Sequence, residues 1–245
     1  MWSKNQINQH ILASKLLIKI KNQAFDLIKN SKSISEYEVQ QFIINKFKEY
    51  NLKSDEHPPI VAFRQSTSNI HYYPKKKSSK KINPNSLIMI DIWARINKSK
   101  APFSDITWMA YKGNRIPKDM QRVFNIVITA RDNALDFIKN SLKNRKLPLG
   151  RDINNIVMDF INKSGFKGKM PHSTGHGLGN NSPHSRRAGL RKSNKNKLLI
   201  NFAYTIEPGI YLKNKFGVRS EIDFYVNKEK KLILTAGLQK KIVKI

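Results

Sequence analysis

Four acidic residues lie in apolar segments, where a carboxylate is costly to bury. Asp91 lies within LIMIDIWARI, and Asp105 follows 14 residues later in FSDITW. Glu207 lies within FAYTIEPGIYL, and Glu221 follows 14 residues later in GVRSEIDFYV. A buried unpaired charge costs several kcal/mol, so each carboxylate needs a counter-charge. A Lys or Arg partner is the simplest hypothesis for any one acid, but two matching pairs favour a divalent metal centre with bridging carboxylates.

The two acidic pairs are separated from each other by the same interval. Asp91 and Glu207 are 116 residues apart, and so are Asp105 and Glu221. A duplicated unit with a pseudo-twofold axis would bring both pairs to one place. The spacing therefore predicts a single site built from two halves of the chain.

A glycine-rich segment, MPHSTGHGLG, adds two histidines to these acids. His172 and His176 have the i, i+4 spacing of zinc-binding helices. Pro171 and the glycines at 175, 177 and 179 exclude a helix here, so we expect an extended or looped segment in which at most one ring binds metal. A histidine with a purely structural role is the alternative for either ring.

The composition sets limits on the class of protein. The chain has 245 residues, with 46 Lys and Arg against 17 Asp and Glu, a formal net charge of +29. Such an excess is typical of nucleic-acid or anionic-surface binding, for which the basic clusters at 75–81 and 186–197 are the candidates. Lys outnumbers Arg by 35 to 11, which favours compositional bias over phosphate recognition. Nucleic-acid binding is therefore the alternative and not the first hypothesis.

Other function classes are excluded by what the sequence lacks. Without Cys there is no disulfide scaffold, thiolate zinc site or Cys nucleophile. No apolar run approaches the ~20 residues of a membrane helix, and the first residues do not resemble a signal peptide. We expect a cytoplasmic protein with no membrane partner.

The elements that must position the site also occur twice. Helical periodicity covers 11–28 and 39–47, with Ser35 and Glu38 in a capping-box pattern, and strands are predicted over 60–63, 71–73 and 87–96. A second set follows: a helix over 120–138, Asp152 as the N-cap of a helix over 153–161, and strands over 198–206, 209–212 and 218–226. The order helix, helix, strands predicts halves of about 1–116 and 117–245.

Five motifs in this order resemble the M24 metallopeptidases, the pita-bread family that includes methionine aminopeptidase, prolidase and Xaa-Pro aminopeptidase. The family pattern places an Asp in a strand, an Asp in S-D-I-T, a His in T-G-H-G-[IL]-G, a Glu in T-[IV]-E-P-G-[IL]-Y and a Glu in G-V-R-x-E. The matching residues are Asp91, Asp105, His176, Glu207 and Glu221. The resemblance covers nearly the whole chain. It implies an α+β pita-bread (creatinase/aminopeptidase) fold: one catalytic domain over 1–245, two pseudo-symmetric halves around an antiparallel sheet, and no separate N-terminal domain.

The resemblance also implies the metal centre and its cofactors. Asp91, Asp105 and Glu221 would hold one divalent ion, and Asp105, Glu221, His176 and Glu207 the other, with Asp105 and Glu221 bridging. Such a hard donor set favours Mn, with Co, Fe or Zn as alternatives. Glu207 would take the proton of the bridging water that attacks the scissile carbonyl.

Further residues match positions that surround the substrate in this family. His71, His172 and His184 would bind substrate, and His172 and His184 would also assist catalysis. Arg219 would not bind metal itself but would orient the carboxylates that do. The sequence departs from the pattern at three places: the turn between Asp91 and Asp105 is longer than usual, no acid follows His184, and Trp108 replaces an Arg.

The motif variants indicate the substrate. E-P-G-I-Y and G-V-R-S-E resemble the Xaa-Pro branch, so the prediction is an exopeptidase that removes an N-terminal residue from Xaa-Pro peptides. Methionine aminopeptidase is the alternative within enzymes, and a non-catalytic pita-bread module that binds nucleic acid or protein is the alternative outside them. Expected partners are a peptide substrate and a second copy in a homodimer.

Overall fold

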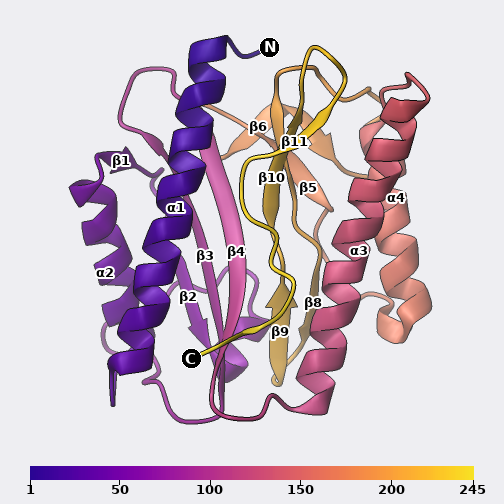
Figure 1. Cartoon of the computed structure of the whole chain (residues 1–245). Helices are drawn as coiled ribbons and strands as arrows, with labels where there is room; N and C mark the ends of the chain where they lie inside the picture. Colours follow the sequence, from indigo (N-terminus) through magenta and orange to yellow (C-terminus); the bar gives the residue numbers. More distant parts are fainter.

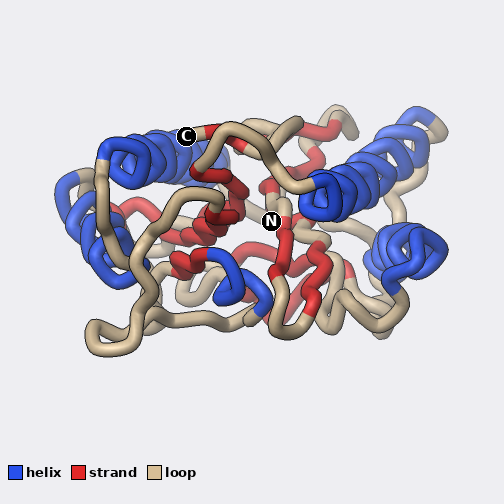
Figure 2. The backbone as a smooth tube through the Cα atoms, turned by 90° about the horizontal axis from the view of Figure 1, so that it is seen from below, coloured by secondary structure: helices blue, strands red, loops and turns tan.

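Two helical layers enclose a central region of strands. The computed structural model describes the backbone of residues 1–245 and all side chains except those of residues 186 and 187, so the start of the basic cluster predicted at 186–197 lies outside the described side chains. The long helices lie at the two outer ends of the molecule and the strands lie between them (Figures 1 and 2).

The first half of the chain forms helices that cover a five-stranded sheet. Its elements are α1 (Lys4–Asn30), α2 (Glu36–Glu49), β1 (Leu52–Lys53), β2 (Ile60–Phe63), the 3-10 helix η1 (Arg64–Ser68), β3 (Ser86–Ile96) and β4 (Phe103–Lys112). The strand order is β1-β3-β4-β12, with β2 also on β3 and with β12 (Val243–Lys244) parallel to β4. The other pairs are antiparallel. The C-terminal strand therefore returns to the sheet of the first half.

The second half repeats the order of helices and strands. Its elements are α3 (Lys118–Lys143), α4 (Gly150–Ile161), the π-helical turn η2 (Asn162–Phe166), β5 (Gly175–Leu178), β6 (His184–Leu190), β7 (Ala203–Ile206), β8 (Gly209–Leu212), β9 (Phe216–Arg219), β10 (Ile222–Val226) and β11 (Leu232–Leu234). A second five-stranded sheet has the order β11-β10-β7-β5-β6, and β8 pairs with β9. Apart from β12, every strand pair is antiparallel, so the predicted α+β class with mostly antiparallel sheets is confirmed.

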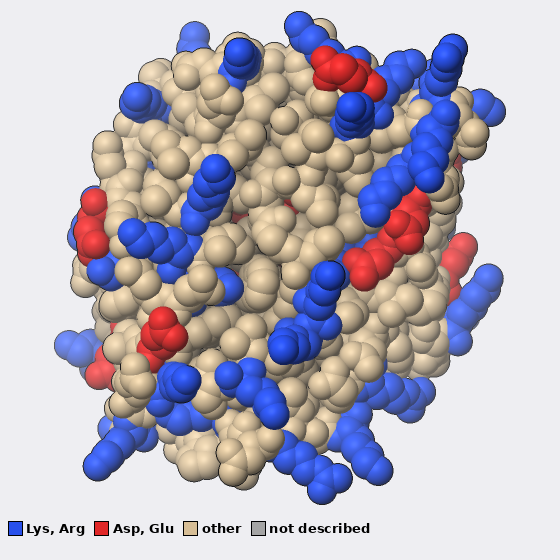
Figure 3. Space-filling view, viewed as in Figure 1, with Lys and Arg blue, Asp and Glu red and all other residues tan. Residues whose placement is uncertain are grey.

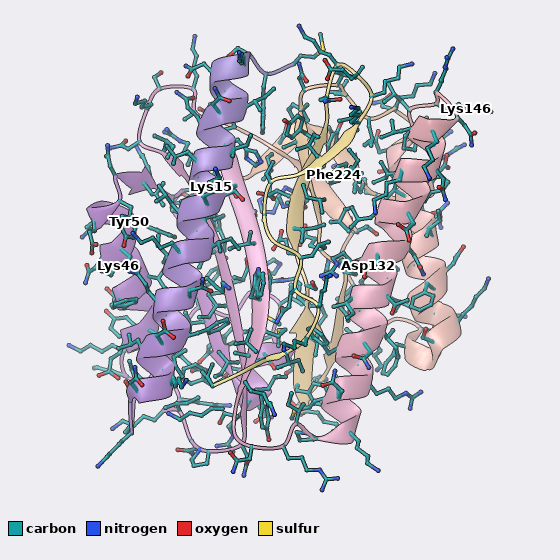
Figure 4. All side chains as sticks on the ribbon, in the orientation of Figure 1. Lys15, Lys46, Tyr50, Asp132, Lys146 and Phe224 are labelled. Carbon is teal, nitrogen blue, oxygen red and sulfur yellow. The ribbon has the colours of Figure 1, made fainter. Side chains whose placement is uncertain are left out.

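Alternation along β3 explains why an acid can lie in so apolar a strand. Ile88, Ile90 and Ile92 belong to the core under α1 and α2, whereas Leu87, Met89 and Trp93 belong to the core shared with the second half. Since successive side chains point to opposite faces, Asp91 lies on the inner face with Met89 and Trp93. In the second half, Phe224 of β10 lies in the middle of the molecule (Figure 4).

Several predicted elements are confirmed, with small changes in their ends. Ser35 caps α2 in a capping box with Glu38, and β2 and β8 have the predicted limits. The helices predicted over 11–28 and 120–138 are longer, because α1 begins at Lys4 and α3 continues to Lys143, and both extensions contain residues such as His10 and Leu142 that are buried against the strands or neighbouring helices.

Other predictions were wrong, for local reasons. Residues 71–73 form a loop and not a strand, because the Tyr72 hydroxyl donates to Glu36 Oε2 (2.6 Å) and holds the segment against the start of α2. Asp152 is not the N-cap of α4. Leu149 has that position, and Asp152 lies in the first helical turn.

Two long strands predicted in the second half are shorter or interrupted. Only Ala203–Ile206 of the segment 198–206 is a strand, because the Leu199 backbone N–H donates to the Tyr204 hydroxyl (2.8 Å) and does not join a ladder. The segment 218–226 divides at Ser220 and Glu221 into β9 and β10. The sequence analysis also did not predict β4, which proves to be one of the longest strands.

Lys and Arg side chains surround the face seen in Figure 3, and carboxylates on it are few. Lys15 on α1 and Lys46 on α2 lie among these outer cations (Figure 4). Over the part of the chain that the structure describes, no helix has the length and apolar content needed to cross a membrane.

Candidate metal centre

A cleft of about 1180 Å³ lies between the two halves. All nine residues predicted for the site line it: Asp91, Asp105, His176, Glu207, Glu221, His71, His172, His184 and Arg219. They come from both halves of the chain, as the repeated acidic pairs suggest.

The first half contributes two carboxylates from one antiparallel pair of strands. Asp105 of β4 lies opposite Trp93, and Asp91 of β3 lies opposite Thr107, so all four side chains share the inner face. Asp105 is 4% exposed, and its Oδ1 atom has no hydrogen-bond partner. A buried carboxylate oxygen without a donor is costly, so the pocket around Asp105 fits a bound cation.

The second half contributes its two glutamates at interruptions of strands. Glu207 lies between β7 and β8, and Glu221 lies between β9 and β10. The Glu221 backbone N–H donates to the Thr107 carbonyl (3.3 Å), and the Thr107 hydroxyl donates to Glu221 Oε2 (2.7 Å). Because its own strand is broken there, Glu221 is connected to β4 of the other sheet, beside Asp105.

His176 of β5 completes the group through a close backbone contact. Its N–H donates to the Thr205 hydroxyl (3.0 Å), next to a register shift between His176 and Gly177. A Cβ at Gly175 would come within 2.1 Å of the Thr205 carbonyl oxygen, so this approach requires glycine. The strand at 175–178 thus agrees with the predicted extended segment, and His176 Nε2 lies 3.3 Å from Glu207 Oε1 and 3.8 Å from Asp105 Oδ2.

Three side chains converge closely enough to hold an ion. One ligand atom each of Asp105, His176 and Glu221 lies within 4.8 Å of the others, and Asp105 and Glu221 are buried. Carboxylates with one imidazole are a suitable donor set for a divalent transition metal. These three residues therefore fit a divalent metal ion at this position.

The pKa values of the buried carboxylates also favour a bound cation. Burial, followed by repulsion from Glu221 and other carboxylates, raises the pKa of Asp105 well above its usual range. Burial likewise raises the pKa of Glu221 well above its usual range and that of Glu207 to about 7. Burial lowers the pKa of His176 to about 3, so its ring is neutral and can act as a ligand. Without a cation, the carboxylates of this centre tend to keep their protons.

Asp91 lies outside the group of three. Its Oδ2 atom accepts a hydrogen bond from Arg219 Nη2 in a buried ion pair. Arg219 Nε also donates to the Thr107 hydroxyl (3.1 Å), which in turn bonds Glu221. Arg219 therefore contacts one predicted metal ligand directly and reaches a second through Thr107.

The other predicted histidines surround this centre at different depths. His172 is half-buried between the Ser173 carbonyl (2.9 Å from Nδ1) and the Tyr211 hydroxyl (3.1 Å from Nε2). The His184 ring lies 4.1 Å from the His176 ring, centroid to centroid, at the exposed rim. His71 is exposed, on the loop between η1 and β3.

Some residues of the site were missed by the sequence analysis. Asp223 is fully buried and accepts from Ser104 Oγ (2.6 Å) and from the Asp105 backbone N–H (3.0 Å), so it supports the strand that carries Asp105. Its position in the apolar segment EIDFYV was the available signal. Tyr211 is the last residue of the motif T-I-E-P-G-I-Y, but its contact with the His172 ring depends on the fold.

Trp108, which replaces the family's Arg, points away from the cleft. It belongs to the core under α1 and α2, where Lys21 Nζ lies 3.7 Å from the centre of its ring. The substitution therefore changes the packing behind β4 and not the lining of the site.

Comparisons with known proteins agree with this geometry. The model of metallopeptidase family M24 matches residues 11–228. An uncharacterized peptidase of Staphylococcus haemolyticus is 30% identical over 202 residues, which cover 82% of this chain and 53% of the relative. The chain thus spans about half the length of this relative.

Solved structures with the same fold include two proline-specific enzymes. A prolidase from Thermococcus sibiricus has a TM-score of 0.86 and 26% identity, over 100% of this chain and 62% of its own. An X-prolyl aminopeptidase from Caenorhabditis elegans, a cytosolic enzyme with a di-nuclear active site, has a TM-score of 0.75 and 21% identity, over 97% of this chain and 39% of its own. The fold is therefore the one found in prolidases, as the sequence predicts.

Proposed function

Because the chain belongs to metallopeptidase family M24, we propose that it is a metal-dependent exopeptidase that removes the N-terminal residue of Xaa-Pro peptides. The observation that carries the proposal is the convergence of Asp105, His176 and Glu221 around a buried carboxylate oxygen without a partner. Similarity over the whole chain to a prolidase supports the substrate class.

We propose that the centre holds two divalent ions, as in the di-nuclear structural neighbour. Asp105, Glu221, His176 and Glu207 would hold one, and Asp91 would join Asp105 and Glu221 around the other. Bound ions would supply Lewis acidity and lower the pKa of a water molecule toward neutrality. Mn is our first choice, since four carboxylates outnumber one imidazole, with Co, Fe or Zn as alternatives.

The chain's own side chains would handle the proton and the substrate. Glu207 is the best-placed base: it is partly open to the cleft, and its carboxylate lies beside His176. His184 at the rim would donate a hydrogen bond to the developing oxyanion, and His172 would contact the peptide from the position fixed by Tyr211. His71 would border the entering chain.

Orientation is the task of Arg219. Arg219 lies on β9, and its ion pair with Asp91 of β3 and its hydrogen bond to Thr107 of β4 fix two neighbouring strands of the first sheet relative to β9. Removal of a residue that hydrogen-bonds to the metal ligands typically lowers metal affinity or activity by about 10- to 100-fold.

A peptide panel with metal analysis tests the proposal. The protein is loaded with Mn or Co, the bound metal is counted, and Xaa-Pro dipeptides and tripeptides are compared with Met-Ala peptides. We expect two ions per chain and cleavage of the Xaa-Pro peptides. Cleavage of Met-Ala peptides alone would make it a methionine aminopeptidase.

Variants separate the metal centre from the rest of the protein. Glu221→Gln should lose both bound metal and cleavage, whereas Asp136→Asn, an exposed acid on α3, should keep both. Two ions retained by Glu221→Gln would contradict the bridging role. A metal-free protein that cleaves nothing but binds RNA with a steep salt dependence would instead be a binding module.

A further inference from the structure

The loop between β1 and β2 brings two further acids, Asp55 and Glu56, to the cleft, and Asp55 is held there by hydrogen bonds. Ser54 Oγ donates to the Trp93 carbonyl (2.9 Å), and Trp93 Nε1 donates to Asp55 Oδ1 (2.7 Å). The His57 backbone N–H donates to the same Asp55 oxygen (3.2 Å). These contacts fix Asp55 on β3, although it belongs to a loop.

This anchor lies next to the metal ligands. Trp93 is the register partner of Asp105 across the β3–β4 pair and lies two residues from Asp91 on the same face. Asp55, Trp93 and Tyr73 all line the cleft. Burial, followed by the negative charges of Asp91 and Asp55, raises the pKa of Tyr73. The charge of Asp55 therefore acts on a side chain that lines the cleft.

Asp55 lacks a strong cationic partner in a very basic protein. Among the side chains that the structure describes, no Lys or Arg nitrogen lies within 4.0 Å of its carboxylate, and His57 Nδ1 is 3.6 Å from Oδ2. The Asp55 side chain is 16% exposed and lines the cleft. Its Oδ1 is occupied by two donors, which leaves Oδ2 to receive a ligand.

Among the described side chains, no Lys or Arg that lines the cleft forms an ion pair with Asp55, and Arg219 is paired with Asp91. Arg95 turns its guanidinium to the carbonyls of Ile96 (3.2 Å) and Lys98 (2.6 Å). Lys53 and Arg191 have exposed side chains at the rim.

Aromatic rings complete the surroundings of this carboxylate. The His57 ring stacks on Tyr73 at a centroid distance of 6.0 Å and an interplanar angle of 28°, and the Trp93 indole is held by Asp55 itself. A carboxylate next to aromatic rings suits an ammonium or guanidinium group, which can form an ion pair with the carboxylate while its aliphatic part packs on a ring.

We propose that Asp55 is a specificity-determining residue that binds the cationic side chain of a lysine or arginine at the first position of the substrate. The proposal rests on the exopeptidase function proposed above and adds a preference for basic N-terminal residues. Trp93 and Tyr73 would enclose the aliphatic part of that side chain.

The test compares Lys-Pro-Ala with norleucine-Pro-Ala, which differ in the ammonium group at the end of the side chain. The Mn-loaded wild-type protein should cleave the lysine peptide with a kcat/KM about tenfold higher, the value of one charged hydrogen bond. Asp55→Asn keeps an oxygen for Trp93 Nε1 and should reduce the ratio of the two kcat/KM values to about one. Glu56→Gln removes the same charge one residue away and should keep the wild-type ratio.

Several results would overturn the assignment. An equal loss for both peptides in Asp55→Asn would mean that Asp55 binds the α-ammonium group, and an equal effect of Glu56→Gln would mean that the loop acts only through its general field. No lysine preference in the wild-type protein would also refute it. If neither peptide is cleaved, the proposed function fails, and calorimetric binding of lysine and norleucine to the Mn-loaded protein decides about Asp55: equal affinities would refute its role.

Discussion

Replacing Asp105 by asparagine should stabilise the metal-free protein and abolish its response to metal. The substitution preserves the shape of the side chain but removes one negative charge from the group formed with Glu221 and His176. In the absence of metal, the ionised carboxylate of Asp105 is repelled by its neighbours and tends to take up a proton, and in the presence of metal it is a ligand. The same substitution should therefore change stability in opposite directions under the two conditions.

The size of the effect follows from the distances. The ligand atoms of Asp105 and Glu221 are at most 4.8 Å apart, and two unit charges at that distance repel by about 3.5 kcal/mol at an effective dielectric constant of about 20. Partial protonation in the metal-free protein relieves some of this energy, because burial and mutual repulsion raise both pKa values. We expect Asp105→Asn to raise the free energy of unfolding in EDTA by about 2 kcal/mol at pH 8, or roughly 4–8 °C in Tm.

Thermal unfolding in EDTA and in excess Mn is the assay. The free energy of unfolding of the wild-type protein should rise by about 3 kcal/mol when Mn is present at about 100 times its Kd, and that of Asp105→Asn should hardly change. Asp136→Asn, with a side chain that is 67% exposed, changes the net charge equally and should stay within about 0.5 kcal/mol of the wild type in both conditions. A variant less stable than the wild type in EDTA, or one that keeps the full gain from Mn, would refute this account of the centre.

Three more predictions follow from other contacts. Arg219→Gln leaves buried Asp91 without its cation and should lower the free energy of unfolding in EDTA by about 3–5 kcal/mol, measured by urea titration, with partial recovery in Mn; an unchanged midpoint would show that the ion pair adds nothing. Gly175→Ala places a Cβ 2.1 Å from the Thr205 carbonyl oxygen, so it should lower the free energy of unfolding by several kcal/mol and also weaken metal binding. A variant as stable as the wild type would argue against the close approach. Burial lowers the pKa of His10 to about 4, so the unfolded chain binds an extra proton between pH 6.5 and 4, and stability should fall by up to about 3 kcal/mol as the pH drops through that window. His10→Gln should flatten this part of the stability–pH curve, and an unchanged curve would exclude His10 as its source.

The predictable part of the site consists of residues that carry their own local signal. Asp91 and Asp105 stand out because an acid in an apolar strand is rare, and the alternation of β3 explains why the structure tolerates it. Ser35 and Glu38 were predicted as a cap because the capping box is contained within four residues. Such signals survive in a single sequence.

The parts that could not be predicted depend on contacts between distant segments. Residues 71–73 have strand-like side chains, yet Glu36 holds Tyr72 in a loop from 36 positions away. Asp55 looks like an ordinary loop acid in the sequence, and only its bond to Trp93 shows that it faces the cleft. Periodicity and motif spacing contain no information about such pairs.

The register of β3 and β4 gives the protein an internal optical probe. Trp93 lies across the strand pair from Asp105 and is 7% exposed, whereas Trp2 and Trp108 lie elsewhere in the fold. Indole emission is sensitive to paramagnetic ions and to the loss of a hydrogen bond at Nε1. In a double variant with Phe at positions 2 and 108, fluorescence would report ion loading and ligand entry at Asp55 in real time, without labels and without turnover.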